Sequence, residues 1–320
     1  MLSLEELALL PLCGLPAYRA VRTFMYAFSS SSMRDGSMPM TPSPSADRRG
    51  FEISSPPTRK GSLSRGTSDH AQGYRRRVLV LRGHDGAGAM AVQMLVGRGW
   101  RVSVHVPFSS VPAYATQEAG DRFMHVVEER ARDWGADEVI FDDGEEGGGP
   151  DDGRGAAVRV LDTLREDGDV FDAVLDTIGG KEVREAAERL LKSAGADGSA
   201  SARLKRRGVG QFTTLVGDHP ERTIPSAGDN FRAGLRSLRP VGGSTTRVGY
   251  AWVSVAQDVD WEGDDVGETL RMVLRLALED GVRPLVEDLV SGDGPDTPRT
   301  TPFERAPSVD GGTVVVKIAQ

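Results

Sequence analysis

Short apolar runs alternate with longer segments of helical periodicity through the middle of the chain. The runs lie at residues 78–81, 101–106, 138–141, 171–177 and 211–217. Their β-branched and leucine content is typical of buried strands. The segments between them place apolar residues three or four positions apart, as Phe123, Val127 and Ala131 do. This order predicts strands joined by helices, and therefore a parallel sheet covered by helices on both faces.

Further elements are expected at both ends of the chain. Residues 3–27 are predicted to form a helix pair, or one helix with a break where Gly14 and Pro16 interrupt the pattern. The C-terminal third is expected to hold a strand, an amphipathic helix and two more strands, at residues 246–255, 267–280, 282–290 and 312–318.

A polar segment separates the first helices from the first strand. Residues 29–74 are rich in Ser, Pro, Thr, Arg and Gly. Such a segment buries too little apolar area to offset its ordering entropy, so we expect disorder. Its Ser-Pro and Thr-Pro sites suit phosphorylation and the binding of regulators, and the alternative is a solvated linker. The expected organisation is therefore four segments, at residues 1–28, 29–74, 75–245 and 246–320.

A glycine loop follows the first strand and leads into a helix. It contains Gly83, Gly86, Ala87 and Gly88, and a second strand begins at Arg101. Glycines allow the backbone to approach a pyrophosphate, and the helix N-terminus offers N–H groups to its charge. The pattern predicts a Rossmann-type βαβ unit that binds a dinucleotide. The alternative is a tight strand-to-helix turn without a ligand.

The choice of cofactor is expected to depend on the loop after Val106. Enzymes that use NAD usually carry an acidic residue there, which binds the ribose 2′-hydroxyl. This chain has Pro107, Phe108, Ser109 and Ser110 instead. The absence of a carboxylate favours NADP over NAD, with Ser109 or Ser110 near a 2′-phosphate. In an equally good interpretation, the serines cap the next element.

The fourth strand ends in a motif that suits a ligand. Asp176, Thr177, Ile178 and Gly179 lie where ligands bind in open α/β sheets, at the carboxyl ends of the strands. They are candidates for a backbone wall beside the nicotinamide ribose. A glycine-assisted turn capped by Thr177 is the structural interpretation, and both can hold together.

Several fragments occur in an order that resembles the medium-chain dehydrogenase/reductase superfamily, in its zinc-independent quinone-oxidoreductase-like branch. The fragments are Leu9–Tyr18, Leu81–Gln93, Gly135–Ile140, Phe171–Gly180, Thr214–Gly217 and Gly312–Ile318. The resemblance implies a doubly wound parallel sheet with remnant flanking elements of a catalytic domain. It adds Val216 and Gly217 to the expected cofactor site. It also implies a homodimer formed through the segment 246–255.

The chain departs from that family in two respects. The family carries a GroES-like barrel before the helix at Leu9, and this sequence begins almost at that helix. The barrel normally forms one wall of the active site. In the glycine loop, Asp85 replaces a family glycine and places a carboxylate where a pyrophosphate is expected, which opposes binding. Arg82 is positioned to offset that charge.

Composition excludes several function classes. The net charge is −8, and residues 29–77 carry nine Lys/Arg against four Asp/Glu, so the rest of the chain is strongly acidic. An acidic body argues against nucleic-acid binding. One cysteine, and five histidines without ligand spacing, predict no metal site. No apolar run reaches the length of a membrane span. The N-terminus resembles no targeting peptide, so we expect a cytoplasmic protein.

The resemblance to the medium-chain superfamily implies a zinc-independent NAD(P)H-dependent oxidoreductase. It is expected to transfer hydride to a small-molecule substrate, a quinone or an activated double bond, and no catalytic side chain is assigned. Tyr18 is a candidate proton donor, with packing as its simpler role. The alternative function is a catalytically inactive nucleotide-binding or scaffold protein, or a fragment of the full enzyme.

Overall fold

A computed structural model gives the fold of this chain. It describes seven stretches, residues 2–29, 75–108, 117–142, 153–193, 209–220, 247–254 and 264–286. Apart from Ser29, the expected segment 29–74 lies outside these residues, and so does the expected strand at 312–318.

Within the described ranges six strands form one parallel sheet, and this confirms the predicted α/β class. The strands are β1 (Arg77–Val80), β2 (Arg101–Val106), β3 (Glu138–Phe141), β4 (Ala173–Asp176), β5 (Val209–Thr214) and β6 (Arg247–Trp252). Their order across the sheet is β3-β2-β1-β4-β5-β6. Since successive strands run outward from β1 in one direction and from β4 in the other, the chain reverses between β1 and β4, which makes this pair a topological switch point.

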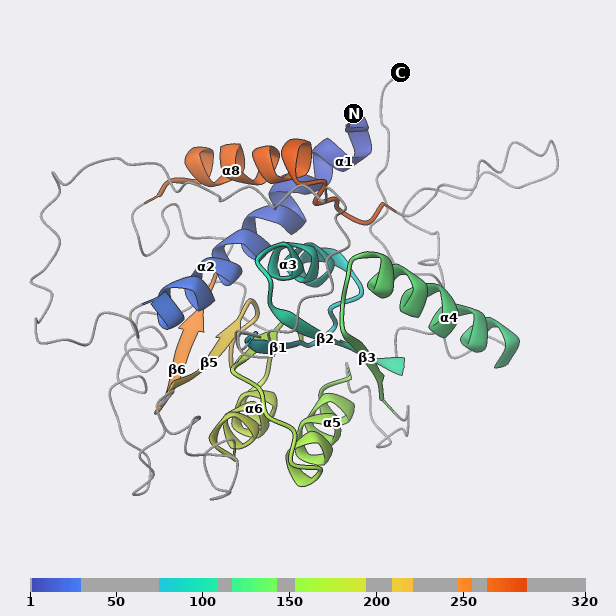
Figure 1. The fold of residues 1–320 in the computed structure, drawn as a ribbon, viewed down its shortest axis with the longest axis vertical. Helices are drawn as coiled ribbons and strands as arrows, with labels where there is room; N and C mark the ends of the chain where they lie inside the picture. The colour runs from blue at the N-terminus through green and yellow to red at the C-terminus, as the bar shows by residue number, and fades with distance from the viewer. Residues whose placement is uncertain are drawn as a thin grey trace, which may run out of the picture.

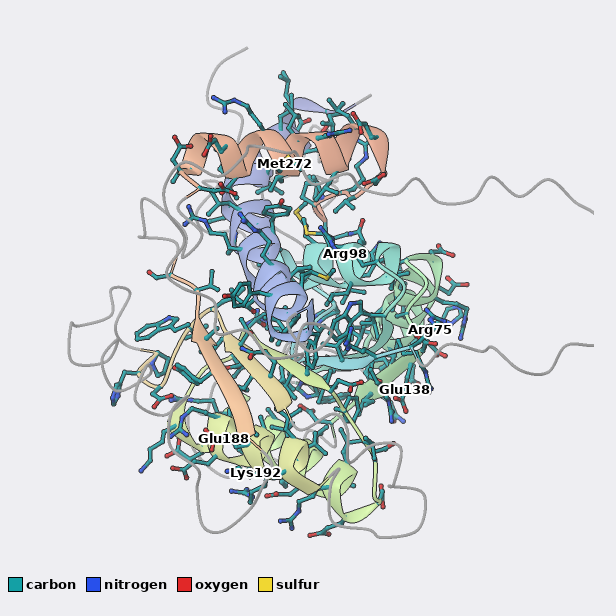
Figure 2. All side chains as sticks on the ribbon, turned by 60° about the vertical axis from the view of Figure 1, so that its left-hand side comes forward. Arg75, Arg98, Glu138, Glu188, Lys192 and Met272 are labelled. Atoms are coloured by element: carbon teal, nitrogen blue, oxygen red, sulfur yellow. The ribbon has the colours of Figure 1, made fainter. Side chains whose placement is uncertain are left out.

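Helices cover both faces of the sheet, as Figure 1 shows. Their bounds are α1 (Leu4–Leu9), the π-helical segment η1 (Leu10–Gly14), α2 (Leu15–Ser29), α3 (Gly86–Gly97), α4 (Gln117–Asp133), α5 (Arg154–Glu166), α6 (Lys181–Ser193) and α8 (Val266–Glu279). Alternate strand residues divide between the two layers. Val78 and Val80 face the core under α2, α3 and α4, whereas Leu79 faces the core under α5 and α6. Figure 2 shows α8, with Met272, at the opposite end of the molecule from Glu188 and Lys192 on α6.

The N-terminal helices run on without the break expected at Gly14 and Pro16. Ser3 and Glu6 form a capping box that starts α1. The chain then widens into η1, where Pro11 stands in the first turn, before continuing as α2. A wider turn accommodates a residue that lacks an N–H donor. A Cβ at Gly14 would lie 2.5 Å from Val273 Cγ1, so the glycine allows α8 to pack closely here.

Two predicted strands differ from the structure. The expected strand at 211–217 ends at Thr214, because the Thr214 hydroxyl accepts hydrogen bonds from the Val216 and Gly217 N–H groups and turns the chain. Within the described part of 282–290, no strand forms. Val282 is 5% exposed and its N–H donates to Leu276 O, so this apolar residue closes the end of α8 instead.

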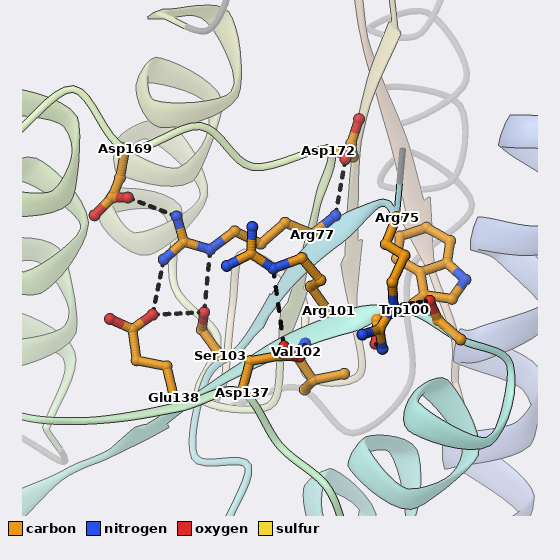
Figure 3. A network of polar contacts seen from close by, with 11 residues as sticks. Arg75, Arg77, Trp100, Arg101, Val102, Ser103, Asp137, Glu138, Asp169 and Asp172 are labelled. Atoms are coloured by element: carbon orange, nitrogen blue, oxygen red, sulfur yellow. Dashed lines mark hydrogen bonds and ion pairs between the residues drawn. The ribbon is translucent and has the colours of Figure 1, made fainter. Parts of the chain in front are cut away.

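Arg77 organises the amino edge of the sheet (Figure 3). Its guanidinium donates to Asp169 and to Glu138 at 2.5 and 2.7 Å, and also lies 4.1 Å from the centre of the Phe171 ring. Its backbone N–H donates to Asp172. One side chain therefore joins β1, β3 and the segment that leads into β4.

Candidate functional site

The candidate site lies at the carboxyl ends of β1 and β4, where the switch point brings two turns together. The Leu81 N–H donates to Leu175 O at 2.9 Å, which extends the pairing of the two strands by one residue. The Thr177 hydroxyl then donates to Leu81 O at 2.8 Å. The first turn, which leads into α3, is thereby fastened to the second, which leads into α6.

The glycine loop is shaped by close backbone approaches. A Cβ at Gly88 would lie 2.5 Å from Arg82 O, and one at Gly83 would press on the Val80 and Val104 side chains. Gly86 has φ +51° and a Cβ there would meet nothing within 4 Å. Arg82 also adopts a positive φ of 51°, which is uncommon for a residue with a side chain. The loop therefore holds the first turn of α3 against β1 and leaves open space beside Gly86.

Asp85 is the N-cap of α3. Its carboxylate accepts a hydrogen bond from the Gly86 N–H at 2.6 Å and lies 3.9 Å from an Arg82 guanidinium nitrogen. An aspartate at this position satisfies a free donor and favours the positive end of the helix dipole. It consequently occupies one of the donors that an anionic ligand would use, and Arg82 partly balances its charge.

The turn after β4 is built around the carboxylate of Asp176, which is 1% exposed. The carboxylate accepts hydrogen bonds from the Ile178 and Gly179 N–H groups at 2.9 and 2.8 Å. Burial raises the pKa of Asp176, and these hydrogen bonds together with that of Thr214 oppose the rise. The Asp176 carboxylate is therefore used within the turn and is not available to a ligand.

The turns after β4 and β5 pack against each other and against β6. Gly179 has φ +83°, and a Cβ there would lie 2.5 Å from Val216 Cγ1. Gly180 donates its N–H to Gly217 O at 2.8 Å. Gly217 in turn packs on Trp252, whose indole would lie 2.6 Å from an added Cβ. The predicted residues Thr177, Ile178, Gly179, Val216 and Gly217 thus form one continuous shelf.

The loop after β2 is described as far as Phe108, and the predicted Ser109 and Ser110 lie outside the described residues. Phe108 is 37% exposed. Its N–H donates to the Asp142 carboxylate at 2.7 Å. A carboxylate thus lies beside the end of β2, supplied by the end of β3. Sequence reasoning missed it, because it searched for an acid only along the residues that follow Val106.

Two buried histidines lie behind these loops. His84 and His105 are 1% and 0% exposed. The Nδ1 atoms of both have no hydrogen-bond partner among the described residues. The His84 ring packs edge-on against Phe123. Burial lowers the pKa of His84 to about 4, with smaller contributions from Arg82, His105 and Arg130, whereas Asp85 acts in the opposite direction.

Other candidates from the sequence take structural roles. Tyr18 is 7% exposed and lies under the Arg22 guanidinium. Among the side chains that the structure describes, no group of three His, Cys, Asp or Glu could hold a metal ion together. No helix in the described ranges has the length and apolar character needed to cross a membrane.

No protein-family model matches this chain, and none of the curated proteins matches it. Solved structures do. The 2-octenoyl-CoA carboxylase reductase CinF, solved with NADP and 2-octenoyl-CoA, is 16% identical, with 89% of this chain and 44% of CinF covered at a TM-score of 0.40. The CurK enoyl reductase is 15% identical, with 65% of this chain and 44% of CurK covered at 0.36. A mycobacterial quinone oxidoreductase is 16% identical, with 68% and 50% covered at 0.33.

The chain spans half or less of the length of these three enzymes. At such identities and TM-scores the likeness carries no argument about this chain, and its activity has to be argued from its own residues.

Proposed function

We propose that this chain binds a nicotinamide dinucleotide at the carboxyl edge of the sheet and acts as a zinc-independent oxidoreductase. The observation that carries the proposal is the β1–α3 loop at the switch point. Gly88 lets the first turn of α3 lie beneath Arg82 O, and the space beside Gly86 is open. A helix N-terminus presented by a glycine loop at this place in the sheet suits a pyrophosphate.

Three groups of residues would contact three parts of such a ligand. The loop from Gly83 to Gly88 would hold the pyrophosphate, and Ser109 with Ser110 would lie near the adenosine ribose. The shelf formed by the turns after β4 and β5 would carry the nicotinamide ribose. When bound, the cofactor supplies a hydride. The role of the chain is to orient the nicotinamide and to exclude water from its reacting face.

The finer parts of the proposal rest on the sequence. NADP is favoured by the absence of a carboxylate directly after Val106. A quinone or an activated double bond is the proposed acceptor, and a homodimer through the segment 246–255 is the proposed assembly, because both are implied by the resemblance to the medium-chain superfamily. No catalytic side chain is assigned.

One observation favours the alternative of a non-catalytic scaffold. Asp85 already occupies the Gly86 N–H with its own carboxylate. A phosphate that approaches this helix N-terminus must therefore displace a like charge, or bind beside it. In the scaffold function, Asp85 acts as a permanent internal substitute for the ligand.

Calorimetric titration with NADPH and NADH separates the two functions. We expect micromolar binding to the unmodified chain, and about tenfold tighter binding after Asp85→Asn, since asparagine keeps the cap but removes the charge. The matched control is Asp265→Asn at the N-cap of α8, a different helix from the one that follows the glycine loop, where Asp265 accepts from the Glu268 N–H at 2.7 Å. This change is expected to leave binding unaltered.

Each outcome of the titration decides between the functions. Binding to the unmodified chain supports the oxidoreductase and justifies assays with quinones and enones. Binding only after Asp85→Asn means that the loop is competent but closed by its own carboxylate, which supports the scaffold. The absence of binding in both folded proteins would overturn the proposal of a dinucleotide site.

A further inference from the structure

The glycine loop carries one positive and one negative side chain close together at the start of α3. Arg82 and Asp85 are the charged residues of the segment 82–88 at neutral pH, because burial lowers the pKa of His84 to about 4 and keeps its imidazole neutral. A guanidinium nitrogen of Arg82 lies 3.9 Å from one carboxylate oxygen of Asp85. The segment that faces the proposed ligand therefore has no net charge of its own.

The two charged side chains are held differently. The other carboxylate oxygen of Asp85 accepts the Gly86 N–H at 2.6 Å, and the Asp85 side chain is 21% exposed. The backbone of Arg82 is pressed against the first turn of α3, since a Cβ at Gly88 would lie 2.5 Å from Arg82 O, whereas its side chain is 52% exposed. The carboxylate is thus fixed at the helix N-terminus, and the guanidinium extends into solvent.

The charge on a phosphate group determines how strongly Asp85 opposes it. Each of the two bridging phosphates of a dinucleotide carries one negative charge, whereas the terminal phosphate of a nucleoside diphosphate carries nearly two above pH 7. Repulsion by a fixed carboxylate grows in proportion to that charge. The attraction of Arg82 grows in the same way, but its guanidinium is the more exposed group and is screened more by solvent and salt. The loop therefore opposes a terminal phosphate more than a bridging one.

We propose that Asp85, balanced by Arg82, makes the glycine loop selective for dinucleotides over nucleotides that end in a phosphate, which rests on the dinucleotide site proposed above. The ligand class that the loop accepts is a pyrophosphate esterified at both ends. The class that it rejects is a nucleoside diphosphate or triphosphate. Asp85 lowers the affinity for both classes, and lowers it more for the second. A side chain that weakens the binding of the cofactor thereby raises the specificity for it.

ADP-ribose and ADP are the matched probes, because they share adenosine and a pyrophosphate and differ in whether the second phosphate is esterified. Calorimetric titration at pH 8 and constant ionic strength gives the ratio of the ADP-ribose affinity to the ADP affinity. In the unmodified chain we expect a ratio of at least about ten. Asp85→Asn is expected to tighten ADP-ribose binding about tenfold and ADP binding about fiftyfold, so the ratio falls about fivefold.

Two further variants complete the test. Arg82→Asn removes the positive charge, and asparagine tolerates the left-handed backbone at this position, where φ is 51°. It should weaken both ligands and raise the ratio about threefold, in the direction opposite to Asp85→Asn. Asp265→Asn makes the same chemical change at the N-cap of α8 and should leave the ratio unaltered. If Asp85 only capped α3, its replacement would change both affinities together and would not move the ratio.

The outcomes separate this inference from the proposed function. If NADPH and ADP-ribose bind and Asp85→Asn keeps the ratio of the unmodified chain, the selectivity is wrong and the dinucleotide site stands. If the ligands bind only after Asp85→Asn, the selectivity is also wrong, because Asp85 then excludes dinucleotides too. If no ligand binds to any of the folded proteins, the dinucleotide site itself is wrong. Should Asp85→Asn fail to fold, the opposite shift expected of Arg82→Asn decides.

Discussion

At the carboxyl edge, some single residues would favour the binding of an anion and others would oppose it. Gly86 and Gly88 keep the loop open and close to the helix, whereas Asp85, directly before Gly86, places a carboxylate on the Gly86 N–H. Asp176 resembles Asp85 in chemistry but is turned inward, where it holds the Ile178 and Gly179 amides. The ability of the site to accept an anion therefore depends on Asp85 more than on any other side chain of the loop.

His84 makes the fold sensitive to acid. Burial lowers its pKa to about 4 from an unfolded value near 6.5, so the unfolded chain binds the extra proton between these two values. The stability that His84 contributes is present above pH 6.5 and is lost as the pH falls towards 4. We expect His84→Phe to remove about 2 kcal/mol of the stability loss between pH 7 and pH 4.5, measured by urea unfolding at each pH.

The control for this measurement is His125→Phe. His125 is 71% exposed on α4 and pairs with Glu129 at 3.6 Å, so its replacement should change the pH dependence by less than about 0.5 kcal/mol. An unfolding free energy whose pH dependence is the same in the unmodified chain and in His84→Phe would contradict the assignment.

Sequence reasoning found the residues of the glycine loop and missed Asp142. The loop is local, since strand, glycines and helix follow one another within twenty residues. Asp142 reaches the end of β2 only through the parallel register of β2 and β3, in which Val106 pairs with Phe141. That register is set by packing across the sheet. The position of a carboxylate 36 residues after Val106 could therefore not be predicted from the sequence near Val106.

At the scale of elements, periodicity located the sheet well and the ends of the elements less well. The first three strands lie within a residue of their predicted positions. The errors occur where a polar group or a packing contact ends an element. Thr214 terminates β5 by accepting two backbone N–H groups, and Val282 is used to close α8. Gly14 is the last residue of η1, and the helix continues there without a break, with Val273 of α8 packed where a side chain would otherwise lie.

The start of α8 provides a test of capping at this scale. Asp265 accepts the Glu268 N–H at 2.7 Å, and the helix packs Val273 and Leu276 into the main core. Asp265→Ala leaves that donor without its cap and is expected to lower the free energy of unfolding by about 1 kcal/mol. Asp265→Asn retains an acceptor and should cost far less. Equal losses in both variants, measured by urea unfolding, would mean that charge and not capping matters here.

Across the whole molecule, the Arg77 network and the proposed ligand site lie at opposite edges of the sheet. The Arg77 network holds the amino edge, and the loops that bear the glycines occupy the carboxyl edge. Arg77→Met should therefore lower the free energy of unfolding by about 2 kcal/mol and leave cofactor affinity within about twofold. Chemical denaturation and calorimetry on the same preparation check both statements.

Arg101→Met is the matched change on the neighbouring strand. Arg101 is 53% exposed and lies 3.8 Å from Asp137, so its loss should cost less than about 0.5 kcal/mol. If Arg77→Met weakened cofactor binding as strongly as it weakened the fold, the two edges could not be regarded as separate.

The contact between Gly217 and Trp252 places an intrinsic fluorophore at the turn after β5. The indole is half-buried and lies directly on the turn after β5. Trp100, by contrast, is 5% exposed and packs between Phe24 and Phe28 beneath α2. A movement of the Gly217 peptide alters the quenching of one indole and leaves the emission of Trp100 unchanged. Local motion at this edge can therefore be followed by tryptophan fluorescence, as the difference between the unmodified chain and Trp252→Phe, which keeps the other three tryptophans.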